Sequence, residues 1–171
     1  MNDPIAGRVR NMIARGVIET ADDSKKAQTL KAEMLDGEVH DDIEHFQMVG
    51  FSSVPQAGAE VIVIFAGGLR SHGIAIATVD RASRLKDLQP GECAIHDDQG
   101  QWVWIKRDGI FIETDKPIMI RGETVTIEAE TATVNAETVN LGGEGGPAVA
   151  RVGDTVSGGV IQSGSAKVFA A

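Results

Sequence analysis

Residues 123–141 repeat every seven residues, and this repeat constrains the fold more than any other feature of the chain. The segment reads ETVTIEAETATVNAETVNL, and its Glu-Thr pairs begin at Glu123, Glu130 and Glu137. Within each repeat, apolar and polar residues alternate, which is the pattern of a strand with one buried face. A coiled coil would need apolar residues three and four apart, whereas β-branched Val, Ile and Thr dominate here. The repeat therefore predicts short β-strands.

The odd length of the repeat requires a change of direction in each unit. Side chains alternate faces along a strand, so a seven-residue step reverses the parity that points inward, and a bend or bulge at each Glu-Thr pair would restore it. Three such units bury too narrow an apolar stripe to fold alone, so we expect three identical chains to wrap together as a trimeric intertwined β-helix or β-prism. An edge hairpin of an ordinary sandwich is the alternative. The predicted trimer-core residues are Val125, Ile127, Val134 and Leu141.

Composition and charge exclude several classes of protein. A net charge of −9 disfavours nonspecific nucleic-acid binding, which needs clustered Lys and Arg. Cys93 is the single cysteine, so we expect neither a disulfide framework nor a cysteine-based metal site. No apolar run approaches the ~20 residues of a membrane span, and residues 1–20 mix charged residues among apolar ones, unlike a secretory signal. We therefore expect the protein to be made and folded in a cytoplasm, without a signal peptide or a transmembrane segment.

Composition also divides the chain into three predicted parts. In residues 1–90, turn residues separate short apolar runs, and about five strands at this spacing predict a small closed barrel of the OB kind. Residues 91–141 contain hairpin signals, including Asp108-Gly109, and then the repeat. Residues 142–171 are Gly-rich. The strands predicted for the barrel are 14–20, 27–34, 60–65 and 73–79.

An acidic cluster in the first part is the main candidate for catalysis. Asp41, Asp42 and Glu44 surround His45, and this set could be drawn as a general base or a metal site. Nothing else in the chain supplies a nucleophile partner. We therefore expect a loop beside a barrel strand, and no enzymatic activity.

Several motifs, in order, closely resemble one family. They are Asp42–Phe51, Pro55-x-x-Gly-x-Glu60, His72–Asp80, Leu88-x-Pro-Gly-Glu92 and Asp108–Ile112. Together they are similar to the central spike protein of Mu-type contractile phage tails, the baseplate assembly protein V group, over roughly residues 1–141. This resemblance implies a homotrimer with an N-terminal OB-fold collar, a β-helical shaft and a narrow apex, located at the centre of the baseplate of the virion. It also implies that residues 1–90 dock to the tail hub, tube and baseplate proteins.

The C-terminal segment Ala150–Ala170 resembles a half-repeat of the PAAR proteins that sharpen related spikes. Such tips usually hold a metal through His or Cys side chains, but here all four histidines and Cys93 lie before residue 97. We therefore expect an apex with no transition metal and no cofactor, and a turn-forming role for Asp154 rather than an axial cation site. The residues expected to pack in the apex are Val152, Val156, Val160, Ile161, Val168 and Phe169.

The function implied by the resemblance is mechanical. We expect a structural, membrane-piercing spike of a contractile tail or related injection device, whose apex is driven into the outer membrane of the target cell. Two alternatives from other classes remain open. One is a β-solenoid tail spike that binds or hydrolyses polysaccharide, which would need paired carboxylates along a long solenoid. The other is an OB-fold binding protein, which would need a basic, aromatic-rich barrel face if its ligand were an oligonucleotide.

Overall fold

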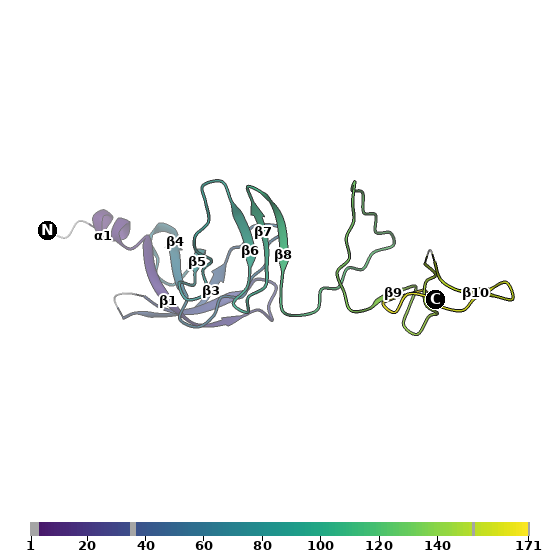
Figure 1. The fold of residues 1–171 in the computed structure, drawn as a ribbon. Coiled ribbons are helices and arrows are strands. Elements are labelled where there is room, and N and C mark those ends of the chain that lie inside the picture. The colour runs from purple at the N-terminus through teal and green to yellow at the C-terminus, as the bar shows by residue number, and fades with distance from the viewer. Residues whose placement is uncertain (1–3, 35–36, 152, 171) are drawn as a thin grey trace. The chain divides into compact units, whose positions relative to one another are not determined.

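The computed structural model describes residues 4–34, 37–151 and 153–170, and the chain divides into two compact units, Met1–Met119 and Ile120–Ala171 (Figure 1). The described residues are almost entirely β-strands and loops, as predicted. Helix is confined among them to α1, Pro4–Arg10, and a single 3-10 turn, η1, Ala66–Gly68. No helix in these described ranges is long and apolar enough to cross a membrane.

Five strands of the first unit form a closed barrel in the order β1-β2-β3-β5-β4. Strand β1 pairs with both β2 and β4, and a short parallel pairing of β3 with β5 completes the circle. Closure between β3 and β5 is made by two residue pairs, Glu44 with Ile74 and His45 with Ala75, and every barrel strand pairs with two neighbours. The prediction of a small closed barrel is therefore confirmed. The strands are β1 Ile13–Asp22, β2 Thr29–Met34, β3 Val39–His45, β4 Glu60–Phe65 and β5 Gly73–Val79.

Strand β3 is the element that the sequence pattern did not predict. The acidic cluster was expected in a loop, and the structure corrects this, because Asp41, Asp42, Glu44 and His45 all lie in β3. Asp42 adopts a left-handed backbone conformation, φ 54°, near an irregularity in the β2–β3 register. This break interrupts the alternation, and Ile43 is the only fully buried aliphatic residue of the strand. Strand β3 therefore lacks the alternating apolar residues from which a strand is predicted.

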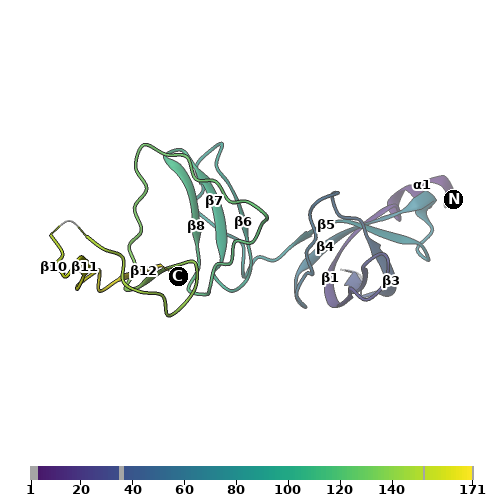
Figure 2. The same ribbon diagram turned by 90° about the vertical axis from the view of Figure 1, so that its right-hand side faces the viewer.

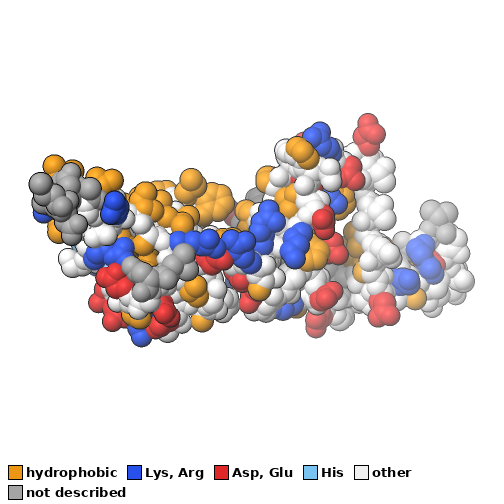
Figure 3. Space-filling model, turned by 90° about the vertical axis from the view of Figure 1, so that its left-hand side faces the viewer, with side chains coloured by type: hydrophobic (Ala, Val, Ile, Leu, Met, Phe, Trp, Pro, Cys, Tyr) orange, Lys and Arg blue, Asp and Glu red, His pale blue; other side chains and the backbone are white. Residues whose placement is uncertain are grey.

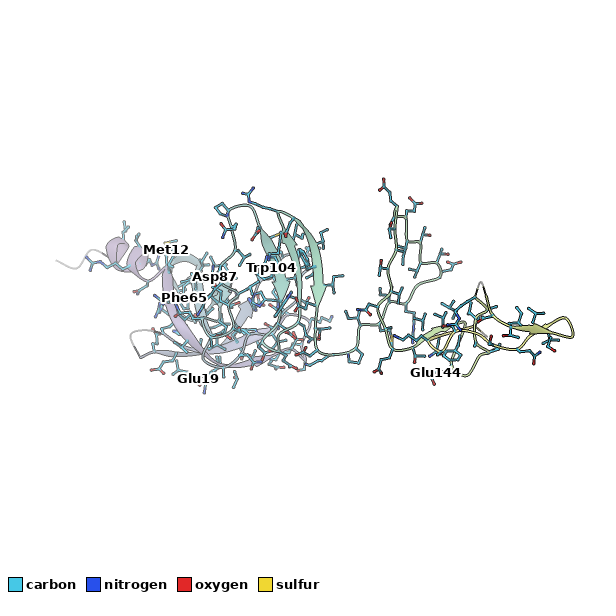
Figure 4. The ribbon with its side chains drawn as sticks, in the orientation of Figure 1. Met12, Glu19, Phe65, Asp87, Trp104 and Glu144 are labelled. Carbon is cyan, nitrogen blue, oxygen red and sulfur yellow. The ribbon has the colours of Figure 1, made fainter. Side chains whose placement is uncertain are left out.

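The barrel encloses an aliphatic core around Phe65 (Figure 4). Phe65 is the largest fully buried side chain, and its ring contacts the Arg70 guanidinium, 4.4 Å from the ring centroid, and the His40 ring at 5.1 Å. Burial of these side chains is sufficient to explain why the barrel folds within one chain. The core residues are Ile18, Leu30, Ala32, Met34, Ile43, Ala59, Val61, Val63, Phe65 and Ala75.

A three-stranded antiparallel sheet follows the barrel in the chain (Figure 2). Its strands are β6 Cys93–His96, β7 Trp102–Lys106 and β8 Gly109–Glu113. The hairpin predicted from the Asp-Gly pair is present, but its turn lies one residue earlier: Lys106 pairs with Gly109, so Arg107 and Asp108 form the turn and Gly109 begins β8.

The described residues of the second unit, 120–151 and 153–170, contain four short strands. Strand β9, Val139–Leu141, pairs in parallel with β12, Val168–Ala170. Strands β10, Val156–Ser157, and β11, Val160–Ile161, form a hairpin. Gly158 and Gly159 make its turn with φ of 60° and 78°, a conformation that side chains disfavour and that suits a two-residue hairpin.

Replacing Phe65 with Ala tests the position of the barrel core. We expect the free energy of unfolding to fall by about 3–5 kcal/mol, because a cavity replaces a packed ring. Phe46→Ala is the matched control, since Phe46 is 58% exposed, and its effect should stay within about 0.5 kcal/mol. Urea denaturation followed by circular dichroism measures both variants. Equal losses would contradict this assignment of the core.

Candidate functional site

The most unusual surface of the chain is the segment 115–138, in which every residue is exposed. The repeat predicted short strands, and the structure of the single chain corrects this, because residues 115–138 contain no strand and only Val139–Leu141 forms one. A strand needs a neighbouring strand to pair with, and none of these residues forms a backbone-to-backbone hydrogen bond with any described part of the chain. Peptide N–H and C=O groups normally find partners when a chain folds. An extended backbone without such partners is available to pair with other chains.

The segment changes direction where the repeat predicts that it should. Bends lie at Glu123, Glu130 and Glu137, the first residue of each Glu-Thr pair, and the residues between them have no regular secondary structure. The predicted bend in each repeat is therefore confirmed. Whether it restores an inward parity depends on the predicted trimer.

The four residues predicted for a trimer core lie outside the core of the single chain. Val125, Ile127 and Val134 are 57%, 80% and 72% exposed, on the segment without strands. Leu141 ends β9 and is 50% exposed. Exposed aliphatic side chains spaced along an unpaired backbone are typical of a surface that another chain covers.

A second exposed apolar surface was not singled out from the sequence. In the β6-β7-β8 sheet, Cys93, Ile105 and Ile110 are paired in one row, and Ile95, Val103 and Ile112 in the next. Directly paired residues project from the same face of a sheet, so these six residues form one surface, which we call the apolar sheet face. Ile95, Ile110 and Ile112 are 64%, 69% and 62% exposed. Period-two alternation combined with the Asp-Gly turn could have located this face.

The opposite face of the same sheet is partly covered. Trp102 and Trp104 are half-buried, and the Lys106 ammonium lies 4.2 Å from the centroid of the Trp104 ring. The two faces therefore differ in chemistry, with aromatic and charged groups on one and only apolar groups on the other.

The described residues predicted to pack in the apex lie in the β10–β11 hairpin and in strand β12. Val156, Val160 and Ile161 lie in the β10–β11 hairpin and are 61%, 61% and 50% exposed. Val168 and Phe169 lie in β12 and are half-buried. Val152 falls outside the described residues.

Asp154 closes a turn. One carboxylate oxygen accepts a hydrogen bond from the Arg151 backbone N–H at 2.6 Å, and the other accepts one from the Arg151 guanidinium at 3.1 Å. These bonds, the backbone one first, hold the pKa of Asp154 below its usual range. Within the described ranges, no three His, Cys, Asp or Glu side chains are grouped so that they could hold a metal ion.

The side chains of the acidic cluster form hydrogen bonds with different partners. His45 is buried and its Nδ1 lies 2.7 Å from Gln28 Oε1, while the Gln28 amide donates to Asp23 and to the Ser53 carbonyl. Since Gln28 Oε1 can only accept, His45 Nδ1 carries the proton, and burial lowers the pKa of His45, which keeps the ring neutral near pH 7. Asp42 instead accepts from Lys25 Nζ at 2.8 Å. These residues do not converge on one site.

Hydrophobic side chains also gather on the surface of the molecule (Figure 3). In the loop that follows β3, Phe46, Met48, Val49 and Phe51 are 58%, 81%, 102% and 61% exposed. The loop that carries them is closed by Gln47, whose amide oxygen accepts from the Ser53 N–H at 2.7 Å and whose amide nitrogen donates to the Ser53 carbonyl at 3.0 Å. A closed loop presents these side chains in a fixed arrangement.

Sequence comparison identifies relatives among phage baseplate proteins. Residues 15–82 match the family model described as Bacteriophage Mu Gp45, N-terminal. The chain is 37% identical over 117 residues to the baseplate puncturing device gp45 of Escherichia phage Mu, covering 68% of this chain and 59% of that protein. It is 31% identical over 122 residues to the Mu-like prophage FluMu protein gp45 of Haemophilus influenzae, covering 71% of this chain and 66% of that protein. The match thus spans about three fifths of the first relative and about two thirds of the second.

The occupied carboxylate of Asp154 leads to a prediction about metal content. We expect purified protein to contain no tightly bound iron or zinc, and EDTA to leave the protease resistance of residues 142–170 unchanged. Elemental analysis by mass spectrometry and limited proteolysis measure the two effects. One iron or zinc per three chains, or a C-terminal segment that EDTA makes protease-sensitive, would contradict it.

Proposed function

Because the chain belongs to the family of the phage Mu baseplate protein gp45, we propose that it forms the homotrimeric, membrane-piercing central spike of a contractile phage tail. One observation carries the proposal: residues 115–138 are exposed, bend at the first residue of each repeat, and form no backbone-to-backbone hydrogen bond with the described part of the chain. Three copies wrapped around one axis supply those partners, and they cover Val125, Ile127, Val134 and Leu141 at the same time.

The proposed shaft is held by inter-chain strand pairing and by burial of its aliphatic residues. Each fully buried Val, Ile or Leu side chain contributes about 1.5–3 kcal/mol. In the proposed trimer the four trimer-core residues of all three chains are buried and stabilise the assembly. In a monomer the same side chains are exposed and contribute little. A rigid shaft of this kind transmits the force of tail contraction along its axis.

The barrel serves as the collar in this proposal. A five-stranded closed barrel is the architecture of OB-folds, and we assign residues 1–90 to an OB-fold collar. Its loop with Phe46, Met48, Val49 and Phe51 is a suitable surface for docking to the tail hub and neighbouring baseplate proteins, because a pre-formed apolar loop loses little entropy on binding.

Residues 142–171 form the apex in this proposal. The phage Mu relative is named a baseplate puncturing device, and we assign contact with the target outer membrane to residues 142–171. In this segment the acids Glu144 and Asp154 are balanced by the bases Arg151 and Lys167, so repulsion from an anionic membrane surface is small. The PAAR-like character of residues 150–170 stays a prediction. A mechanical, non-enzymatic role is favoured over a polysaccharide hydrolase by the same relative.

Replacing Ile127 with Asp tests the shaft. In the proposed trimer this change places three carboxylates around one axis, where burying each unpaired charge costs several kcal/mol, and we expect the trimer to dissociate. Thr126→Asp is the matched control, because it adds the same charge at the neighbouring position of opposite parity, and it should leave the trimer intact. Analytical ultracentrifugation measures both masses. A stable trimer of the Ile127→Asp variant would show that this parity does not point inward.

Removing the barrel tests whether the shaft assembles without the collar. A fragment that starts at Pro90 should still assemble into trimers, because the sheet and the seven-residue repeats are all retained. Size-exclusion chromatography with light scattering gives its mass. Recovery of the fragment only as a monomer would indicate that residues 1–90 are required for assembly.

A further inference from the structure

The seven-residue repeat leaves the alignment of neighbouring chains underdetermined. A shift of one repeat would place Val125 beside Ala132 and Ile127 beside Val134 of the next chain, so apolar residues would still meet apolar residues. Register is specified weakly wherever a shift preserves the pattern of buried side chains. Some part of the chain without the repeat must therefore fix the alignment.

The apolar sheet face precedes the repeat in the sequence. Strand β8 ends at Glu113, the exposed segment begins at residue 115, and the first repeat begins at Glu123. A groove of about 420 Å³ borders the face, and Ile118 lines it together with the apolar residues Ile95, Val103 and Ile112 and the acids Asp97 and Glu113. The chain therefore runs beside the face at least as far as Ile118 before it enters the segment assigned to the shaft.

The chemistry of the face suits further copies of this chain. It presents Cys93, Ile95, Val103, Ile105, Ile110 and Ile112 and no charged group, so three copies can meet there without burying a charge, although each chain carries a net charge of −9. Its sequence does not repeat, so a copy displaced by one repeat would leave these side chains exposed.

The size of the face excludes independent docking of another protein. Three strands about 4.8 Å apart and about five residues long cover only about 200 Å². Specific protein interfaces bury about 800 Å² on each partner. The face is therefore large enough only as part of a longer interface, and the exposed segment that follows it supplies the remainder.

We propose that the apolar sheet face of β6-β7-β8 is where three copies of this chain meet on the axis, and that this contact sets the register of the repeats that follow. The proposal rests on the trimeric spike proposed above. It places Cys93 inside the assembly, although Cys93 is exposed in the single chain.

The reactivity of the native thiol tests the contact. In the full-length trimer, Cys93 should react with Ellman's reagent at least ~10-fold more slowly than in guanidinium-unfolded chain. A control with Cys93→Ser and His96→Cys carries its thiol on the opposite face and should react at nearly the rate of the unfolded chain. A trimer with a fully reactive Cys93 would overturn this inference and leave the trimeric spike standing, whereas a monomer would overturn both.

Cross-linking tests the register. Two Cys93→Ser chains, one with Ile127→Cys and one with Val134→Cys, are assembled together and oxidised. When the apolar sheet face is unchanged, we expect disulfides only between two copies of position 127 or between two copies of position 134. Adding Ile112→Asp to both chains should produce mixed 127–134 disulfides or abolish the trimer, while His96→Asp, on the opposite face, should change neither. A trimer with Ile112→Asp that still pairs only identical positions would overturn the role of the face in setting register.

Discussion

Unpaired backbone in residues 115–138 is the constraint on which the rest of the structure depends. The segment is exposed, and its peptide groups have no backbone partners within the described chain. Unpaired peptide groups in a monomer favour uncontrolled association with other chains. In the proposed trimer, three such segments close around one axis and pair with one another. The bend at each Glu-Thr pair makes this closure compatible with a seven-residue repeat.

The barrel differs from the segments that follow it in how its apolar side chains are buried. The barrel buries its own core and closes into a ring of five strands within one chain. The aliphatic side chains of the apolar sheet face and the trimer-core residues stay 37–80% exposed among the described residues. In the proposed spike, this difference separates a collar that binds other baseplate proteins from a shaft that only identical copies can build.

Local patterns predicted much of the fold. Strands β1, β2, β4 and β5, the β7–β8 hairpin and the bends at Glu123, Glu130 and Glu137 followed from alternation and turn chemistry, although the hairpin turn lies at Arg107-Asp108, one residue before the Asp-Gly pair. Strand β3 was missed because Asp42 breaks its alternation with a left-handed backbone. The apolar sheet face was missed for a different reason: alternation shows which residues share a face, but it does not show whether the same chain covers that face. The roles of Val125, Ile127, Val134 and Leu141 depend on a second and third chain, so they stay predictions.

Hydrogen–deuterium exchange of the unmodified chain tests the central claim most directly. If residues 115–138 pair between chains, their amides should exchange slowly in the assembled protein, with protection comparable to that of the barrel strands. Protection should also disappear at concentrations where the assembly dissociates. Exchange of these amides at the rate of an unstructured peptide, in protein whose barrel is protected, would contradict the account.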